Sequence, residues 1–111
     1  MKEQYAAILP ELRTVARAHG YALALHGSGM RDLDLIAVPW IEDAAADTVL
    51  VEALRACVGG FITNDPDAQV GDYTRRSPES RPHGRLAWAI YLFISNGSLY
   101  IDLSVMPKVA P

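Results

Sequence analysis

Three aspartates stand inside apolar segments that have the residue pattern of β-strands. Asp32 and Asp34 are separated by one leucine, and Asp102 lies between an isoleucine and a leucine. Successive side chains of a strand point to opposite faces, so Asp32 and Asp34 share one face. Two carboxylates this close repel each other unless a cation neutralises them, and Mg²⁺ is the natural candidate. Taken alone, Asp102 would be interpreted as a solvated residue on the exposed face of a strand. Together with Asp32 and Asp34 it predicts a shared acidic site of three carboxylates.

The segment before the last two apolar runs is locally basic. It contains Arg75, Arg76, Arg81 and Arg85, although the chain as a whole is acidic. We interpret Arg75 and Arg76 as residues of a solvated loop. Arg81 and Arg85 flank the sequence Pro-His-Gly, where a fixed backbone could aim a guanidinium at a phosphate or at the aspartates. A solvated loop is the equally open alternative for these two arginines.

The elements that must position these side chains follow from periodicity and from turn residues. Apolar residues at helical spacing predict an amphipathic helix over 3–19, either kinked at Pro10 or beginning there, with Gly20 as a left-handed stop. A second helix is predicted over 41–57, with acidic residues at its start and two glycines after it. Strands are predicted at 21–25, 32–38, 86–94 and 99–106, with a long loop at 62–85 and a hairpin turn at 95–98. This order predicts one α+β domain over 1–111, with helices on one face of a mixed or mostly antiparallel sheet.

The composition excludes several classes of protein. The chain has 111 residues, a formal net charge of -3 and one cysteine. These values argue against a surface that coats DNA, a disulfide framework and a zinc site built on paired cysteines. The sequence has no apolar run of membrane-spanning length and does not begin like a signal peptide, so we expect a cytoplasmic protein that does not bind membranes.

These residues resemble the nucleotidyltransferase superfamily that includes DNA polymerase β and the minimal nucleotidyltransferases of toxin–antitoxin systems. The family pattern is a hydrophobic residue before Gly-Ser, then Asp-x-Asp on a strand and a third carboxylate on a later strand. Its counterparts here are Leu25-His26-Gly27-Ser28, Asp32-Leu33-Asp34 and Ile101-Asp102-Leu103. The chain is most similar to short nucleotidyltransferase-like proteins of phages and prophages, over most of its length from residue 21 onward.

The resemblance implies a nucleoside triphosphate, two Mg²⁺ ions and a hydroxyl acceptor. Asp32 and Asp34 would hold both ions, and Asp102 would share one of them and help to deprotonate the acceptor, which would be a protein or an RNA. Gly27 and Ser28 would bind the β- and γ-phosphates.

One feature of the sequence supports an alternative from another class. Only three residues separate Gly27-Ser28 from Asp32, fewer than is usual in the family, so the helix start that normally binds the triphosphate is missing. The alternative is a non-catalytic interaction module on a degenerate fold, such as a phage inhibitor of a host defence protein.

Overall fold

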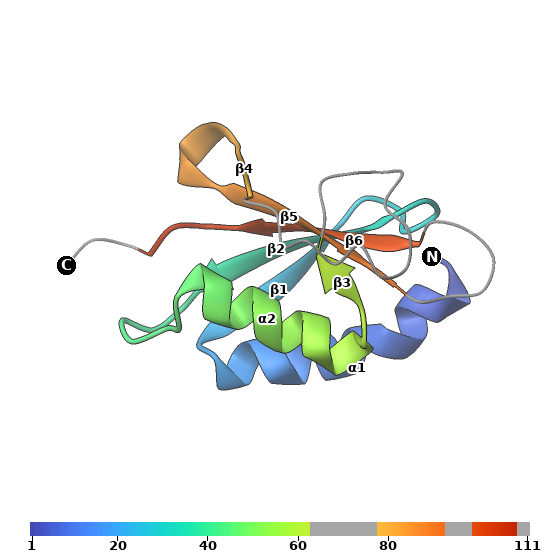
Figure 1. Ribbon diagram of the computed structural model, residues 1–111, viewed down its shortest axis with the longest axis horizontal. Helices are drawn as coiled ribbons and strands as arrows, with labels where there is room; N and C mark the ends of the chain where they lie inside the picture. Colours follow the sequence, from blue (N-terminus) through green and yellow to red (C-terminus); the bar gives the residue numbers. More distant parts are fainter. Residues whose placement is uncertain (63–77, 93–98, 109–111) are drawn as a thin grey trace.

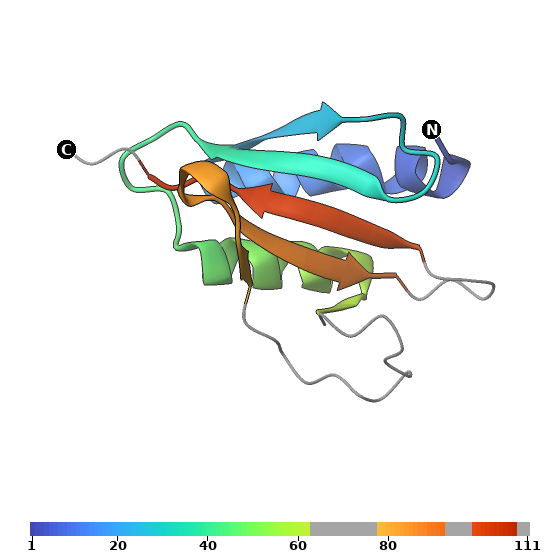
Figure 2. The same ribbon diagram turned by 90° about the horizontal axis from the view of Figure 1, so that it is seen from above.

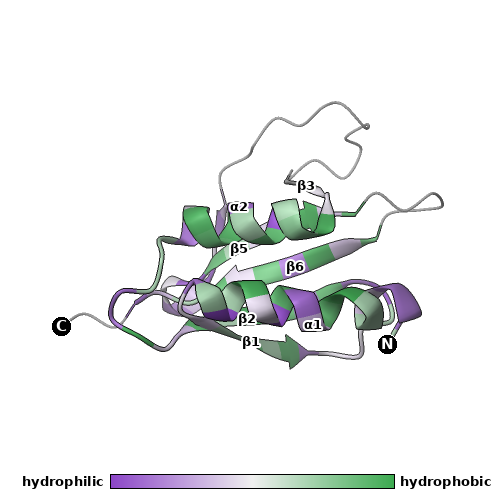
Figure 3. Ribbon diagram, turned by 90° about the horizontal axis from the view of Figure 1, so that it is seen from below, coloured by the Kyte–Doolittle hydropathy of each residue, from purple (hydrophilic) through white to green (hydrophobic). Residues whose placement is uncertain are grey.

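The computed structural model describes residues 1–62, 78–92 and 99–108, and these form two layers. One layer is a mixed β-sheet, and the other consists of α1 (Glu3–Ala18) and α2 (Asp47–Val58), which both lie on the same face of it (Figure 1). Seen from the helix side, α1 and α2 run side by side across the sheet (Figure 3). The predicted α+β class and the placement of the helices are confirmed.

The sheet has six strands within the described residues, and its order is β1-β2-β6-β5-β3, with β4 also paired to β5. The strands are β1 (Tyr21–His26), β2 (Leu33–Pro39), β3 (Phe61–Ile62), β4 (Glu79–Ser80), β5 (Leu86–Tyr91) and β6 (Tyr100–Val105). All pairs are antiparallel except β2 and β6, which are parallel. From above, β1 forms one edge of the sheet, and β2 and β6 lie inside it (Figure 2).

Most predicted elements are present with small shifts at their ends. The first helix continues through Pro10. The proline is tolerated there because the helix has buried residues both before it, at Tyr5 and Leu9, and after it, at Leu12 and Ala16. The strand predicted to begin at Asp32 begins at Leu33, and the last two strands pair as the predicted hairpin. The hairpin turn at 95–98 and the arginines Arg75 and Arg76 lie outside the described residues. The predicted loop over 62–85 was too long, because β4 and a short 3₁₀ turn (Pro82–Gly84) lie within it.

The second helix was predicted to begin at residue 41, and this is wrong. The helix begins at Asp47, and residues 41–46 instead cross the corner between α1 and β1. Tertiary hydrogen bonds hold them there: the Ala45 N–H donates to the His19 carbonyl at 2.9 Å, and the Tyr21 hydroxyl donates to the Ala45 carbonyl at 2.7 Å. These bonds replace the helical bonds that an alanine-rich segment would otherwise form.

The core lies between the sheet and the two helices. Alternate residues of the central strands enter it, and so do the inward faces of both helices. Its fully buried members include Tyr5, Leu12, Leu33, Leu35, Leu50, Leu54, Ile90, Ile101 and Leu103. The residues between them on β2 and β6, including Asp34 and Asp102, therefore face away from the helices.

We expect Gly20→Ala to lower the free energy of unfolding by about 3 kcal/mol, because a Cβ would need a left-handed backbone and would overlap its neighbours. The φ angle of Gly20 is +87°, and an added Cβ would lie 2.8 Å from the Ala44 Cα. Gly59→Ala is the matched control: its φ is +64° but nothing lies within 4 Å. It should cost about 1 kcal/mol. Equal losses in urea unfolding would contradict the close contact at the corner.

Candidate metal and nucleotide site

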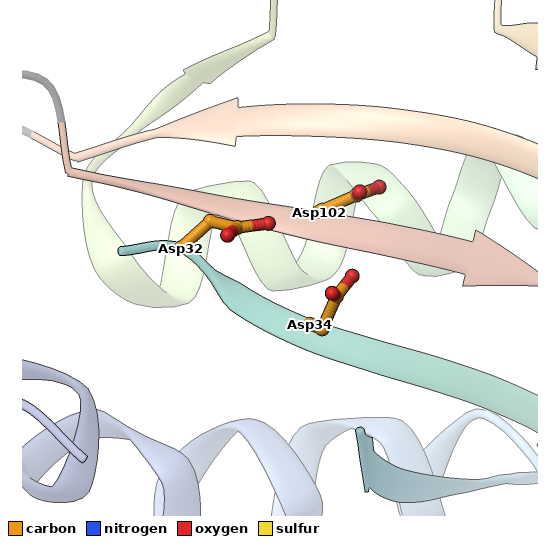
Figure 4. Close-up of side chains that lie close together, drawn as sticks. All are labelled: Asp32, Asp34 and Asp102. Carbon is orange, nitrogen blue, oxygen red and sulfur yellow. The ribbon is translucent and has the colours of Figure 1, made fainter. Parts of the chain in front are cut away.

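The three aspartates converge on the face of the sheet that the helices leave open. Asp34 of β2 and Asp102 of β6 are register partners in the parallel pair, and Asp32 precedes Asp34 by two residues. One carboxylate oxygen from each residue lies within 4.8 Å of the others. Figure 4 shows the three side chains on one side of the two strands, with the helices behind. The pairing of β2 with β6 thus brings together residues that are far apart in the sequence.

Negative charge is concentrated at this cluster. All three aspartates are half-buried. The pKa of Asp102 is raised, first because burial disfavours its charged form and then because the Asp34 carboxylate lies beside it. A hydrogen bond with Asp34 and the charge of Asp32 act in the same direction, and Arg81 opposes them. Asp102 therefore keeps its proton to a higher pH than an ordinary aspartate does.

The aspartates form one wall of a cleft of about 460 Å³. The turn that follows β1 also lines this cleft, and Gly27 and Ser28 lie in that turn. The lining residues are His26, Gly27, Ser28, Gly29, Met30, Arg31, Asp32, Asp34, Tyr100 and Asp102. His26 is exposed and pairs in register with Asp34, so it lies at the cleft and not in the core.

The turn at 27–32 has no helical residues. Gly27 has a φ of +75°, and a Cβ there would lie 3.8 Å from the Asp34 Oδ2, an ordinary contact. The left-handed backbone conformation therefore accounts for a glycine at this position. The Ser28 hydroxyl accepts a long hydrogen bond of 3.4 Å from the Met30 N–H, and it remains exposed toward the cleft.

The first turn of α1 holds this turn in place. The Lys2 N–H donates to the Gly29 carbonyl at 3.0 Å, and the hydroxyl of Tyr5 donates to the Arg31 carbonyl, next to Asp32. Tyr5 is completely buried. Its role was missed in the sequence, where it was only one apolar position of an amphipathic helix.

The two flanking arginines differ in their positions. Arg81 lines a second cleft with Asp102, and its charge lowers the pKa of that aspartate, while it also forms an ion pair with Glu79 at 3.1 Å. Arg85 instead donates its Nε–H to the Pro82 carbonyl at 3.1 Å and lines neither cleft. The structure thus brings Arg81 close to Asp102, whereas Arg85 stabilises the short 3₁₀ turn at Pro82–Gly84.

Tyr100 is a site residue that the sequence prediction did not name. It lines both clefts with Asp102, and its ring stacks on Tyr91 with the centroids 5.1 Å apart. Burial and the charges of the aspartates raise the pKa of Tyr100, so its hydroxyl stays protonated. The signal was present, because Tyr100 stands two residues before Asp102 in a strand and must share its face.

The donor set suits a hard divalent cation. Three carboxylates offer oxygen ligands, which Mg²⁺ prefers, and their mutual repulsion would be relieved by a bound positive charge. Burial is the first cause of the raised pKa of Asp102, and the charges of Asp34 and Asp32 add to it. Asp32, Asp34 and Asp102 could therefore hold a cation between β2 and β6.

The chain matches no model of a known protein family, no curated protein and no solved structure. In the described part of the chain, no helix has the length and apolar character needed to cross a membrane.

The acidic cluster should make stability depend on pH. The pKa of Asp102 lies above its ordinary value of 3.8, so the folded state keeps this proton at a higher pH than the unfolded chain. The stability that Asp102 contributes is therefore fully present at a pH below its pKa in the unfolded chain. It is lost as the pH rises through the pKa of Asp102 in the folded state. At about pH 7 and without metal, Asp102→Asn should raise the free energy of unfolding by on the order of 0.5 kcal/mol, because it removes a like-charge contact.

The same comparison at about pH 3 should show little gain, since both forms are then uncharged at this position. Asp43→Asn is the control, because Asp43 is exposed and lies beyond the far end of β2. A pH-independent gain from Asp102→Asn in urea unfolding would mean that repulsion is not its cause.

Proposed function

We propose that this chain is a minimal nucleotidyltransferase-like protein that binds a nucleoside triphosphate with Mg²⁺ and transfers a nucleotide to a hydroxyl acceptor. The observation that carries the proposal is the convergence of Asp32, Asp34 and Asp102 in one cleft with a Gly-Ser turn. This arrangement offers cation ligands and, in the same cleft, a turn whose backbone N–H groups we expect to bind phosphate oxygens. The sequence resemblance to the superfamily rests on the same residues.

The chemistry required is an attack by the acceptor hydroxyl on the α-phosphorus. The bond from that phosphorus to the bridging oxygen breaks, and pyrophosphate leaves. Bound Mg²⁺ supplies charge neutralisation of the phosphate oxygens and of the departing pyrophosphate. Asp32 and Asp34 hold the cation side of the site, and the Gly27-Ser28 turn orients the triphosphate. Asp102, which lies beside the other two carboxylates, accepts the hydroxyl proton at a carboxylate oxygen.

One observation favours the second candidate, a non-catalytic interaction module. The Gly-Ser turn leads directly to β2 without any helix, so the triphosphate would gain no helix dipole and few aligned N–H groups. In that case the acidic cleft is an inherited feature, and the chain acts by binding a protein partner. The two candidates differ in whether labelled nucleotide is transferred.

The metal site is tested by thermal unfolding with and without a divalent cation. We expect millimolar Mg²⁺ or Mn²⁺ to raise the unfolding temperature, because a ligand of the folded state stabilises it by mass action, by about 2.7 kcal/mol at a hundredfold excess over Kd. Asp34→Asn should abolish this gain, while the matched variant Asp43→Asn keeps it. The scan is repeated with a triphosphate, since part of the coordination can come from its phosphates. An equal gain in Asp34→Asn would show that the cation binds elsewhere.

Transfer is tested with α-labelled triphosphates, Mg²⁺ and a pool of protein and RNA. We expect labelled product, and Asp102→Asn should lower its rate by about a hundredfold or more, the usual effect of losing a general base. The same variant should retain triphosphate binding within a few-fold, because Gly27, Ser28, Asp32 and Asp34 remain. Label in a triple Asp→Asn variant would contradict these residue assignments. No label from the unmodified chain, with triphosphate binding intact, would favour the interaction module.

A further inference from the structure

The outer edge of β1 presents unpaired backbone groups. The Trp40 N–H donates to the Gly20 carbonyl at 3.0 Å, in line with the β1–β2 register, so the even-numbered residues of β1 bond to β2. The N–H and C=O groups of Tyr21, Leu23 and Leu25 therefore point away from β2. No backbone hydrogen bond to another described residue engages them. This edge can accept a further strand.

The edge also lacks the features that usually prevent strand addition. Edge strands are commonly protected by lysine, proline, a bulge or an inward charge. The sequence of β1, Tyr-Ala-Leu-Ala-Leu-His, has none of these, and no described element lies beside it in the sheet (Figure 2). Near this edge, Leu25 of β1, Val38 of β2 and Trp40 are 38%, 42% and 60% exposed.

A cleft of about 250 Å³ runs along this edge, and its two sides differ in chemistry. Arg13 and Arg17, one helical turn apart on α1, line it with Tyr21, Ala22, Leu23 and Trp40. Both arginines are exposed, and neither forms an ion pair with a described residue. The side toward α1 is thus cationic, and the side toward the open face of the sheet, with Ala22 and Trp40, is apolar.

We propose that the outer edge of β1 binds an extended segment of a partner protein that alternates acidic and apolar side chains. Such a segment adds to the sheet as a strand, and its main chain bonds to Tyr21, Leu23 and Leu25. Because strand side chains alternate, one set meets Arg13 and Arg17 and the other meets Ala22 and Trp40. The proposal does not depend on the acidic cleft or on nucleotide transfer.

Charge decides between this partner and a second copy of the chain. Pairing two β1 edges about a twofold axis near Leu23 would bring the arginines of both copies to one seam, since they line the cleft with Tyr21, Ala22 and Leu23. Four guanidinium groups without acidic partners would repel each other there. A single-stranded RNA could pair with the arginines, but it would leave the N–H and C=O row of β1 without matching partners.

The test is a titration of the whole ¹⁵N-labelled chain, followed by amide chemical shifts. The probe is a synthetic peptide of alternating glutamate and valine, about eight residues long, enough to span β1. We expect the amides of Tyr21, Leu23 and Leu25 to shift and to become protected from hydrogen exchange. The same peptide with an N-methyl group at every residue, or with lysine in place of glutamate, should not bind.

Variants of the chain separate charge from strand pairing. Arg17→Glu should weaken binding about tenfold, the scale of losing a charge-assisted contact. Lys108→Glu changes the net charge equally at an exposed residue beyond β6, and it should change binding less than about twofold. Leu25→Pro removes one outward N–H without touching the bonds to β2, and it should also weaken binding. If that variant does not fold, the comparison of Arg17→Glu with Lys108→Glu decides.

Three results would overturn the proposal. If the N-methylated peptide bound as tightly as the unmodified one, the edge would bind anions without strand pairing. Tighter binding of an oligouridylate than of the acidic peptide would assign the edge to nucleic acid. A dimer in sedimentation equilibrium that Leu25→Pro dissociates would assign it to a second copy of the chain.

Discussion

The parallel pairing of β2 with β6 is the interaction on which the candidate site depends. It sets Asp34 beside Asp102, and a slip of one residue would turn Asp102 toward the helices. The register is fixed by burial, because the leucines at 33, 35 and 103 must all face the core. Burying one such side chain contributes about 1.5–3 kcal/mol, while two like charges near a surface cost about 1–4 kcal/mol. The core therefore holds the carboxylates together against their repulsion.

Part of this arrangement could be predicted from local sequence. The alternation of apolar residues around Asp34 and Asp102 predicted on which face of its strand each aspartate lies. The last two apolar runs of the sequence predicted the pairing of β5 with β6. Nothing local specifies that β2 lies beside β6 or runs parallel to it, because that neighbour relation depends on how the whole chain packs. The expectation of one acidic site rested on the Asp-x-Asp pair and on the resemblance, and the distances among the carboxylates came only with the structure.

Tertiary contacts explain where the sequence prediction was wrong. The alanine-rich residues 41–46 have a high helix propensity, but propensity amounts to less than about 1 kcal/mol per residue and yields to specific bonds. The hydroxyl of Tyr21 and the close approach of Gly20 to Ala44 hold this segment in the corner. Tyr5 also shows what local sequence does not specify. Its position in the helix predicts only burial, but its hydroxyl donates to the Arg31 carbonyl and so holds the turn before Asp32.

Strand β1 carries two surfaces that are far enough apart to act independently. Its first residue, Tyr21, lies beside the arginine-lined cleft, and its last residue, His26, pairs with Asp34 in the acidic cleft. Five residue steps along a strand span about 16 Å, and charges at physiological ionic strength are screened over about 8 Å. Arg13 and Arg17 therefore do not balance the charge of the acidic cleft, which is left to Arg31, Arg81 or a bound cation. A partner strand on the edge of β1 would lie on the flank of the sheet, and the open face would stay accessible to a nucleotide.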